Sequence, residues 1–134
     1  MRTYVLDASA FLAFLDGKPG AIKVADCLTE AQRGRAAVLM SAINCGEAYG
    51  VLLRLYGRDR ATSTMSAAHP LPITVEDATR QRSLAAAEIK ETYKLYYSDS
   101  FAAALALEHK ATLVTSDSDF RRLGHGFPIL WLKN

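Results

Sequence analysis

The sequence is poor in cysteine and contains no long hydrophobic run. Its two cysteines, Cys27 and Cys45, have neither metal-binding nor redox spacing, so we expect two buried, reduced thiols. The longest unbroken apolar stretch, residues 101–107, is far too short to span a bilayer. Asp7 interrupts the N-terminal apolar run at once, and no secretory signal is visible. These absences predict a cytoplasmic protein without a membrane-spanning segment.

The sequence also lacks the motifs of several common enzyme classes. It has no Gly-x-Ser-x-Gly elbow of a serine hydrolase and no Gly-rich loop followed by Lys that would cradle a phosphate. The three histidines, His69, His109 and His125, have no zinc-binding spacing. We therefore expect the histidines to be structural.

Neither sign of charge dominates the composition. Half of the 134 residues are hydrophobic and 22% are charged, which is typical of a globular protein. This length predicts a single domain, residues 1–134, with a substantial core. The formal net charge of +2 is too small by itself to indicate a nucleic-acid-binding protein.

Short apolar runs alternate with helical patterns along the chain. Gly17 ends one predicted helix and Pro19 begins the next. Ser41, Thr74 and Ser98 are placed to cap three others. Strands that alternate with helices imply right-handed crossovers and an α/β fold with a parallel sheet covered on both faces. The predicted strands are 3–6, 36–40, 71–74, 112–115 and 128–132, and the predicted helices are 8–15, 19–33, 43–57, 59–68, 75–92, 99–110 and 118–123.

Four acidic residues carry the functional signal. Asp7 and Asp117 follow apolar runs and mark the carboxyl ends of two predicted strands, where the functional crevice of a parallel sheet lies. Asp99 opens a helix with alanines at its next same-face positions, and Glu47 has apolar residues four positions away on either side. An isolated carboxylate on such a face is costly unless it is paired or binds a metal. The four acids together predict one acidic, metal-binding pocket.

Each acid taken singly also has a structural interpretation. Asp7 can cap the following helix, and the dipole of a helix N-terminus favours an anion such as Asp99. Asp117 and Asp119 can stabilise a turn, and Glu47 can be exposed at an edge. The common direction of the acids favours the pocket, because every one points toward the same predicted crevice.

The charge outside this pocket is basic. If Asp119 is added to the four acids of the pocket, nine acidic residues remain elsewhere in the chain. Against them stand 16 lysines and arginines, which gives a formal charge of +7 outside the pocket. A negative hole within a positive rim suits a polyanion held at the rim while a divalent cation screens the centre. Basic and aromatic residues of one segment are candidates to line an RNA path, with a solvated helix face and core aromatics as the alternative. They are Arg80, Arg82, Lys90, Lys94, Tyr93, Tyr96 and Tyr97.

The helix predicted over 43–57 is unusual in two respects. Gly46 and Gly50 lie inside it, where each costs about 1 kcal/mol relative to alanine; close approach of another segment or a ligand would account for them. The helix is also apolar on more than one face, so it needs a second covering surface besides the sheet.

At this point the motifs resemble those of PIN-domain ribonucleases. The matching segments are Asp7-Ala8-Ser9, Asn44-Cys45-Gly46-Glu47, Asp99-Ser100-Phe101-Ala102-Ala103 and Leu113-Val114-Thr115-Ser116-Asp117-Ser118-Asp119-Phe120. Within that family the length and motifs look most like VapC, the toxin of bacterial VapBC toxin–antitoxin pairs. The resemblance covers the whole chain, and residues 98–120 are its most specific part.

The resemblance implies an α/β/α sandwich and an endoribonuclease that depends on Mg²⁺ or Mn²⁺. Asp7, Asp99 and Asp117 then become direct or water-mediated metal ligands. Glu47 holds a second metal or orients the attacking water, and Asp119 supports the site. Hard divalent cations prefer such carboxylate oxygens. Three further residues are candidate partners of the acids, or simply turn and helix residues: Ser9, Asn44 and Thr115.

The VapC resemblance also implies partners: an RNA substrate, a VapB-like antitoxin and a second copy of the chain in a homodimer. One alternative is a PIN-like RNA-processing nuclease without an antitoxin. Another is a Mg²⁺-binding receiver or phosphatase-type domain. A receiver expects a lysine at a late strand end, and the final predicted strand has none before Lys133. A haloacid-dehalogenase-type phosphatase needs an aspartate where Ser9 stands.

Overall fold

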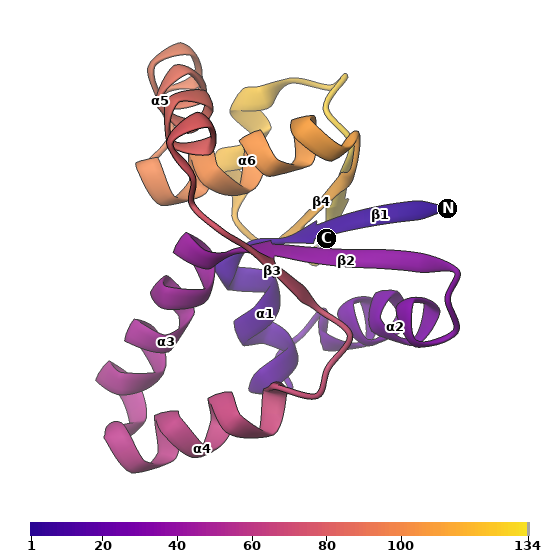
Figure 1. Ribbon diagram of the computed structural model, residues 1–134, viewed down its shortest axis with the longest axis vertical. Coiled ribbons are helices and arrows are strands. Elements are labelled where there is room, and N and C mark those ends of the chain that lie inside the picture. Colours follow the sequence, from indigo (N-terminus) through magenta and orange to yellow (C-terminus); the bar gives the residue numbers. More distant parts are fainter. Residues whose placement is uncertain (134) are drawn as a thin grey trace.

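The computed structural model describes residues 1–133 and is built around a parallel sheet. Five strands lie in the order β3-β2-β1-β4-β5, and every neighbouring pair is parallel (Figure 1). The strands are β1 (Arg2–Leu6), β2 (Ala36–Ser41), β3 (Thr74–Glu76), β4 (Thr112–Thr115) and β5 (Ile129–Trp131). The predicted parallel sheet is therefore confirmed.

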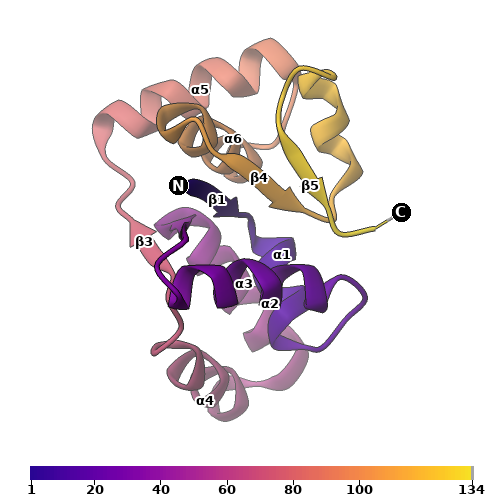
Figure 2. The ribbon, with the colours of Figure 1, turned by 90° about the vertical axis from the view of Figure 1, so that its right-hand side faces the viewer.

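Helices cover both faces of the sheet. Figures 1 and 2 show α5 and α6 on one side, with α1, α2 and α3 on the other and α4 farthest from the strands. The helices are α1 (Ala8–Leu15), α2 (Ala21–Gln32), α3 (Ala42–Tyr56), α4 (Arg58–Ala68), α5 (Arg80–Tyr93) and α6 (Tyr97–His109), followed by a 3₁₀ helix η1 (Ser118–Leu123). The architecture is the expected three-layer α/β/α sandwich.

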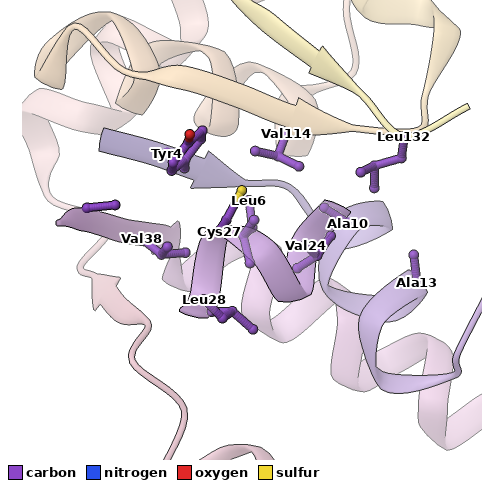
Figure 3. Close-up of a cluster of buried hydrophobic side chains, with 11 residues drawn as sticks. Tyr4, Leu6, Ala10, Ala13, Val24, Cys27, Leu28, Val38, Val114 and Leu132 are labelled. Carbon is purple, nitrogen blue, oxygen red and sulfur yellow. The ribbon is translucent and has the colours of Figure 1, made fainter. Parts of the chain in front are cut away.

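Alternation along the central strand divides the core into two halves. Tyr4 and Leu6 of β1 join a cluster with residues of α1 and α2, including Val24 (Figure 3). Val5, between them, joins the cluster on the α6 face with Leu113. Successive side chains of a strand point to opposite faces, and both faces of this sheet are covered. The central strands are therefore uninterrupted apolar runs.

Two boundaries that were predicted from the sequence around β3 are wrong. The strand lies at Thr74–Glu76, paired with Leu39–Ser41, rather than at 71–74. Pro72 has no N–H to donate to a ladder, so the strand begins beyond it. Thr74 is consequently used in the sheet, and the N-cap of α5 is Thr79, whose hydroxyl accepts from the Arg82 N–H.

Three further expectations need correction. Ser98 lies inside the first turn of α6, whose N-cap is Tyr96. Cys45 is half-buried rather than buried, whereas Cys27 is buried. A Cβ atom added at Gly46 or Gly50 would meet nothing within 4 Å, so close packing within the chain does not account for these glycines.

The α3–α4 arm accounts for part of the apolar surface predicted for residues 43–57. α4 packs against α3, burying Leu52 and Ala61. Leu53 and Leu55 nevertheless remain 37% and 53% exposed. Within residues 1–133, no helix combines the length and apolar character needed to cross a membrane.

The strand order places a crevice between β1 and β4. The connection from β1 leads to β2 on one side, and the connection from β4 leads to β5 on the other. Ligands of open parallel sheets bind at such a switch point, beyond the carboxyl ends of the strands. Asp7 follows β1 at this point, and its N–H donates to the carbonyl oxygen of Val114 in β4 at 3.3 Å.

Candidate functional site

Asp7 is fixed at the centre of the crevice. It is 3% exposed and is the N-cap of α1. Oδ1 accepts from the Ala10 N–H at 2.8 Å and from the Ser9 hydroxyl at 2.7 Å. Oδ2 accepts from the Thr115 hydroxyl at 2.5 Å. Burial raises the pKa of Asp7 to about 6, and these three hydrogen bonds oppose the rise.

Ser9 and Thr115 join the ends of β1 and β4. The Thr115 hydroxyl accepts from the Asp117 N–H at 2.9 Å, and the Ser9 hydroxyl accepts from the Ser116 N–H at 3.0 Å. Each hydroxyl therefore donates to Asp7 while accepting from the turn that carries Asp117. The sequence interpretation of Ser9 and Thr115 as partners of the acids is supported by this geometry.

Asp99 lies across the crevice in the first turn of α6. It is 9% exposed, and none of the hydrogen bonds within residues 1–133 ends on its carboxylate. Burial raises its pKa to about 7, with smaller contributions from the charges of four other acids, Asp117, Glu47, Asp7 and Asp119. All five predicted acids are therefore close enough to interact.

Asp117 and Asp119 complete a compact group of carboxylates. One oxygen from each of Asp99, Asp117 and Asp119 can lie within 4.8 Å of the others. Asp117 is the N-cap of η1, and its Oδ1 accepts from the Asp119 N–H at 2.9 Å. Arg122 approaches Asp119 Oδ1 at 4.0 Å, the outer limit of an ion pair. The sequence interpretation gave Asp119 a supporting role and included it among the candidate metal-binding residues, and its carboxylate lies within this group.

Glu47 reaches the crevice from α3 and is exposed, contrary to the expectation of an inward-facing carboxylate. Its two oxygens accept from Asn44 Nδ2 at 3.3 Å and from the Ser98 hydroxyl at 3.1 Å. Asn44, which is fully buried, also donates to the Ser98 carbonyl oxygen at 2.9 Å. Glu47 is therefore held at the rim of the crevice by two side-chain donors while remaining open to solvent.

Ser98 and Arg122 are contacts that sequence reasoning missed. Ser98 was assigned only to a helix cap, although it donates to Glu47. Arg122 lies three residues after Asp119 on η1, a helical spacing that brings two side chains to one face. That spacing could have identified Arg122 as a neighbour of the acids.

The donor set fits a hard divalent cation. Carboxylate oxygens with no cysteine or histidine among them are the ligands that Mg²⁺ and Mn²⁺ prefer. In addition, Asn44 Oδ1 is buried and has no hydrogen-bond partner within the described chain, which leaves acceptor capacity beside the acids. A cation would relieve the mutual repulsion that helps to raise the pKa of Asp99.

The fold is shared with several toxin–antitoxin proteins. A DNA-bound VapBC complex from Salmonella typhimurium aligns with a TM-score of 0.76 at 17% identity, covering 98% of this chain and 99% of the other. A promoter-bound VapBC from Rickettsia felis gives a TM-score of 0.73 at 15% identity, covering 96% and 97%. A sarcin–ricin-loop-cleaving VapC toxin from Mycobacterium tuberculosis gives 0.72 at 18%, covering 90% and 95%.

No curated protein matches this sequence significantly. The model of the PIN domain family, however, matches residues 4–126, a span that contains all five acids of the crevice. Sequence and fold agree, because the structurally similar chains are VapC toxins aligned over nearly their full length. The chain therefore belongs to the PIN domain family.

Proposed function

We propose that this chain is an endoribonuclease that depends on Mg²⁺ or Mn²⁺ and acts as the toxin of a toxin–antitoxin pair. The observation that carries the proposal is the convergence of five carboxylates on the switch point of the sheet, one of them with its pKa raised to about 7. Membership of the PIN domain family favours a nuclease over a receiver or phosphatase.

The five acids of the crevice have different roles in this proposal. Asp99, Asp117 and Asp119 offer oxygens to one cation, and Asp7 faces them from a rigid position set by its three hydrogen bonds. Glu47, held by Asn44 and Ser98, binds a second cation or orients the attacking water. A bound divalent cation supplies an activated water and neutralises charge on the phosphate and the leaving oxygen.

RNA is the proposed substrate for two reasons. The VapC toxin of Mycobacterium tuberculosis with the same fold is a sarcin–ricin-loop-cleaving toxin. The surface outside the five acids also carries a formal +7, which attracts a polyanion.

Cleavage of a structured RNA by the purified protein tests the enzymatic part. We expect cleavage with Mg²⁺ or Mn²⁺ and none with EDTA. Asp99→Asn should abolish cleavage and leave the fold intact, whereas Asp119→Asn should reduce it less. Asp26→Asn, which changes an exposed acid of α2, is the matched control and should be fully active. Full activity of Asp99→Asn would contradict the assignment.

The partners are proposed on the same basis. Several proteins with this fold were solved as toxin–antitoxin complexes, and the α3–α4 arm exposes Leu53 and Leu55. We propose a VapB-like antitoxin and a homodimer. Expression of the chain alone should arrest growth, and co-expression of the adjacent open reading frame should relieve it. A monomer in light scattering together with no growth arrest would favour an RNA-processing nuclease without an antitoxin.

A further inference from the structure

A second hollow opens beside the acidic crevice. It lies between the end of α5, the turn into α6 and the 3₁₀ helix η1. Its volume of about 430 Å³ is within the range of small-ligand sites, about 300–1,000 Å³. Asp119 lines this hollow and also belongs to the compact carboxylate group. The hollow therefore adjoins the proposed catalytic centre, with Asp119 as the shared side chain.

The walls of the hollow are held by specific contacts. Arg122 Nη1 donates to the carbonyl oxygen of Lys94 at 2.7 Å and so ties η1 to the α5–α6 turn. Leu95 in that turn is 3% exposed and anchors it in the core. Tyr97 packs edge-on against Phe101, with ring centroids 5.0 Å apart, and its hydroxyl donates to the Ser83 carbonyl oxygen. These contacts hold the α5–α6 turn and η1 in place around the hollow.

Two side chains of the hollow are left free by these contacts. Lys94 caps α5 with a left-handed backbone (φ 59°), and Tyr96 is 73% exposed. Within residues 1–133, no hydrogen bond or ion pair occupies the Lys94 ammonium group or the Tyr96 hydroxyl. Lys90, by contrast, is paired with Glu91 at 3.0 Å. Across the described residues the Lys94 ammonium group is thus without a close partner, although Lys90 and, more weakly, Lys94 lower the pKa of Glu91, which also lines the hollow. The Tyr96 ring is exposed and available for stacking.

Other members of the predicted RNA path have different roles. Arg82 makes a bidentate contact with Glu108 at 2.9 and 3.0 Å, and Tyr93 packs against the core cluster of the α6 face. Those two residues follow the structural alternative considered for this segment. Arg80 is exposed but does not line the hollow, so the described members of the predicted path that are free and line it are Lys94 and Tyr96.

We propose that this hollow is a nucleotide subsite of the enzyme. It holds an unpaired nucleotide adjacent to the scissile phosphate, with the base stacked on Tyr96 and the neighbouring phosphate held by Lys94 and Arg122. The proposal rests on the proposed ribonuclease function and assigns Tyr96, Lys94 and Arg122 to substrate binding. Proteins read such RNA by stacking unpaired bases on exposed aromatic rings and by pairing phosphates with basic groups.

Steady-state cleavage of a fluorescent RNA hairpin with an unpaired loop tests the subsite. Tyr96→Leu should raise KM roughly 5- to 100-fold, because stacking on an aromatic ring is lost, and Tyr96→Phe should restore it. Lys94→Gln should raise KM and lower the slope of log KM against log salt by about one. For all three variants kcat should stay within about twofold of wild type.

Lys110→Gln is the matched control for the lysine. Lys110 is also a helix C-cap with a left-handed backbone (φ 51°) and is exposed, but it lies at the opposite end of α6 from Asp99. Its replacement removes the same charge from the same backbone geometry and should leave KM unchanged. An equal rise of KM in both lysine variants would show that the effect comes from the net charge of the protein alone. That result would overturn the subsite.

A binding measurement separates failure of the subsite from failure of the enzyme. Fluorescence anisotropy of a short single-stranded RNA with the Asp99→Asn chain requires no cleavage. If wild type cleaves no RNA but binding still depends on Tyr96 and Lys94, the nuclease proposal fails and the hollow is an RNA-binding site without a catalytic role. If wild type cleaves RNA but neither residue alters KM or binding, the subsite is wrong.

Two further outcomes would also overturn the subsite. A fall in melting temperature and kcat at unchanged KM would show that Tyr96 and Lys94 act only in folding. Unchanged RNA kinetics with impaired relief of growth arrest by the antitoxin would assign the hollow to a protein partner instead.

Discussion

At the scale of single residues, the ionised form of Asp99 lowers the stability of the folded protein most clearly among the acids of the site. Its carboxylate is buried among like charges, and its pKa is raised from 3.8 to about 7. A folded-state pKa above the unfolded value means that the folded protein binds the proton more tightly. Stability of the metal-free protein is therefore highest below about pH 4 with respect to this group, and it falls as pH rises toward 7.

This linkage gives a first prediction. In EDTA at pH 8, Asp99→Asn should raise the melting temperature by roughly 3–8 °C, because the repelled charge is removed. At pH 5 the difference should shrink, since Asp99 is then protonated in the folded state. Thermal melts of wild type and variant at both pH values decide the point. A variant that melts below wild type at pH 8 would mean that Asp99 stabilises the fold.

Asn44 is the second residue whose position carries a prediction. It is fully buried, and its amide joins Glu47 to the Ser98 carbonyl oxygen. Asn44→Ala should cost about 1–3 kcal/mol of unfolding free energy, because a fully buried side chain and its part-buried hydrogen bond to the Ser98 carbonyl oxygen are lost. Cleavage should fall as well, because Glu47 is no longer held. Urea denaturation and RNA cleavage measure the two effects, and the exposed substitution Thr29→Ala of α2 is a neutral comparison.

At the scale of elements, α6 sets the position of Asp99. Ala102, Ala103 and Ala106 are at most 1% exposed and lie against the sheet, as their spacing predicted. The small side chains bring the helix close to the strands, so the first turn of α6 reaches the ends of β1 and β4. The distance between Asp99 and Asp117 thus depends on residues that touch no substrate.

The third prediction concerns a larger side chain at the contact between α6 and the sheet. Ala103→Leu should destabilise the protein by about 1–3 kcal/mol and reduce RNA cleavage although every acid is retained. Leu107→Ala, at a 54% exposed position of the same helix, should change both quantities little. Denaturant titration and cleavage assays compare the pair. Wild-type cleavage in a destabilised Ala103→Leu protein would show that the acids tolerate movement of α6.

The elements also show what the sequence could and could not reveal. Apolar runs such as residues 4–6 located the central strands, because strands buried on both faces need no alternation. β3 was displaced because its two partly exposed residues, Thr74 and Val75, depend on pairing with β2 rather than on a local pattern. The acids at strand ends were predictable from local signals. The rim position of Glu47 was not, since it follows from the tertiary donors Asn44 and Ser98.

At the scale of the whole molecule, the acids that suit a cation lower the stability of the metal-free protein. Five acids share one crevice, while the rest of the chain carries an excess of basic over acidic residues. A cation that binds only the folded protein stabilises it by mass action. The metal-free chain should therefore be the least stable form of the native protein.

Metal addition tests this balance as the fourth prediction. Mn²⁺ at about 100 times its dissociation constant should add roughly 2.7 kcal/mol to the unfolding free energy. The matching rise in melting temperature should be mostly lost in Asp99→Asn and kept in Asp26→Asn. Metal affinity should increase from pH 6 to pH 8, because protons compete for Asp99 and Asp7. Equal shifts in both variants would locate the metal elsewhere.

The pairing of β1 with β4 has a consequence for synthesis of the chain on the ribosome. Asp7 accepts from Thr115, which lies 108 positions later, and Asp99, Asp117 and Asp119 all belong to the last third of the sequence. A nascent chain that has emerged only through α5 holds Asp7 and Glu47 but none of the other acids. Contacts this distant in sequence form late because the intervening chain must first close. The proposed nuclease activity should therefore appear only after residues 112–123, which include Asp117 and Asp119, have left the exit tunnel.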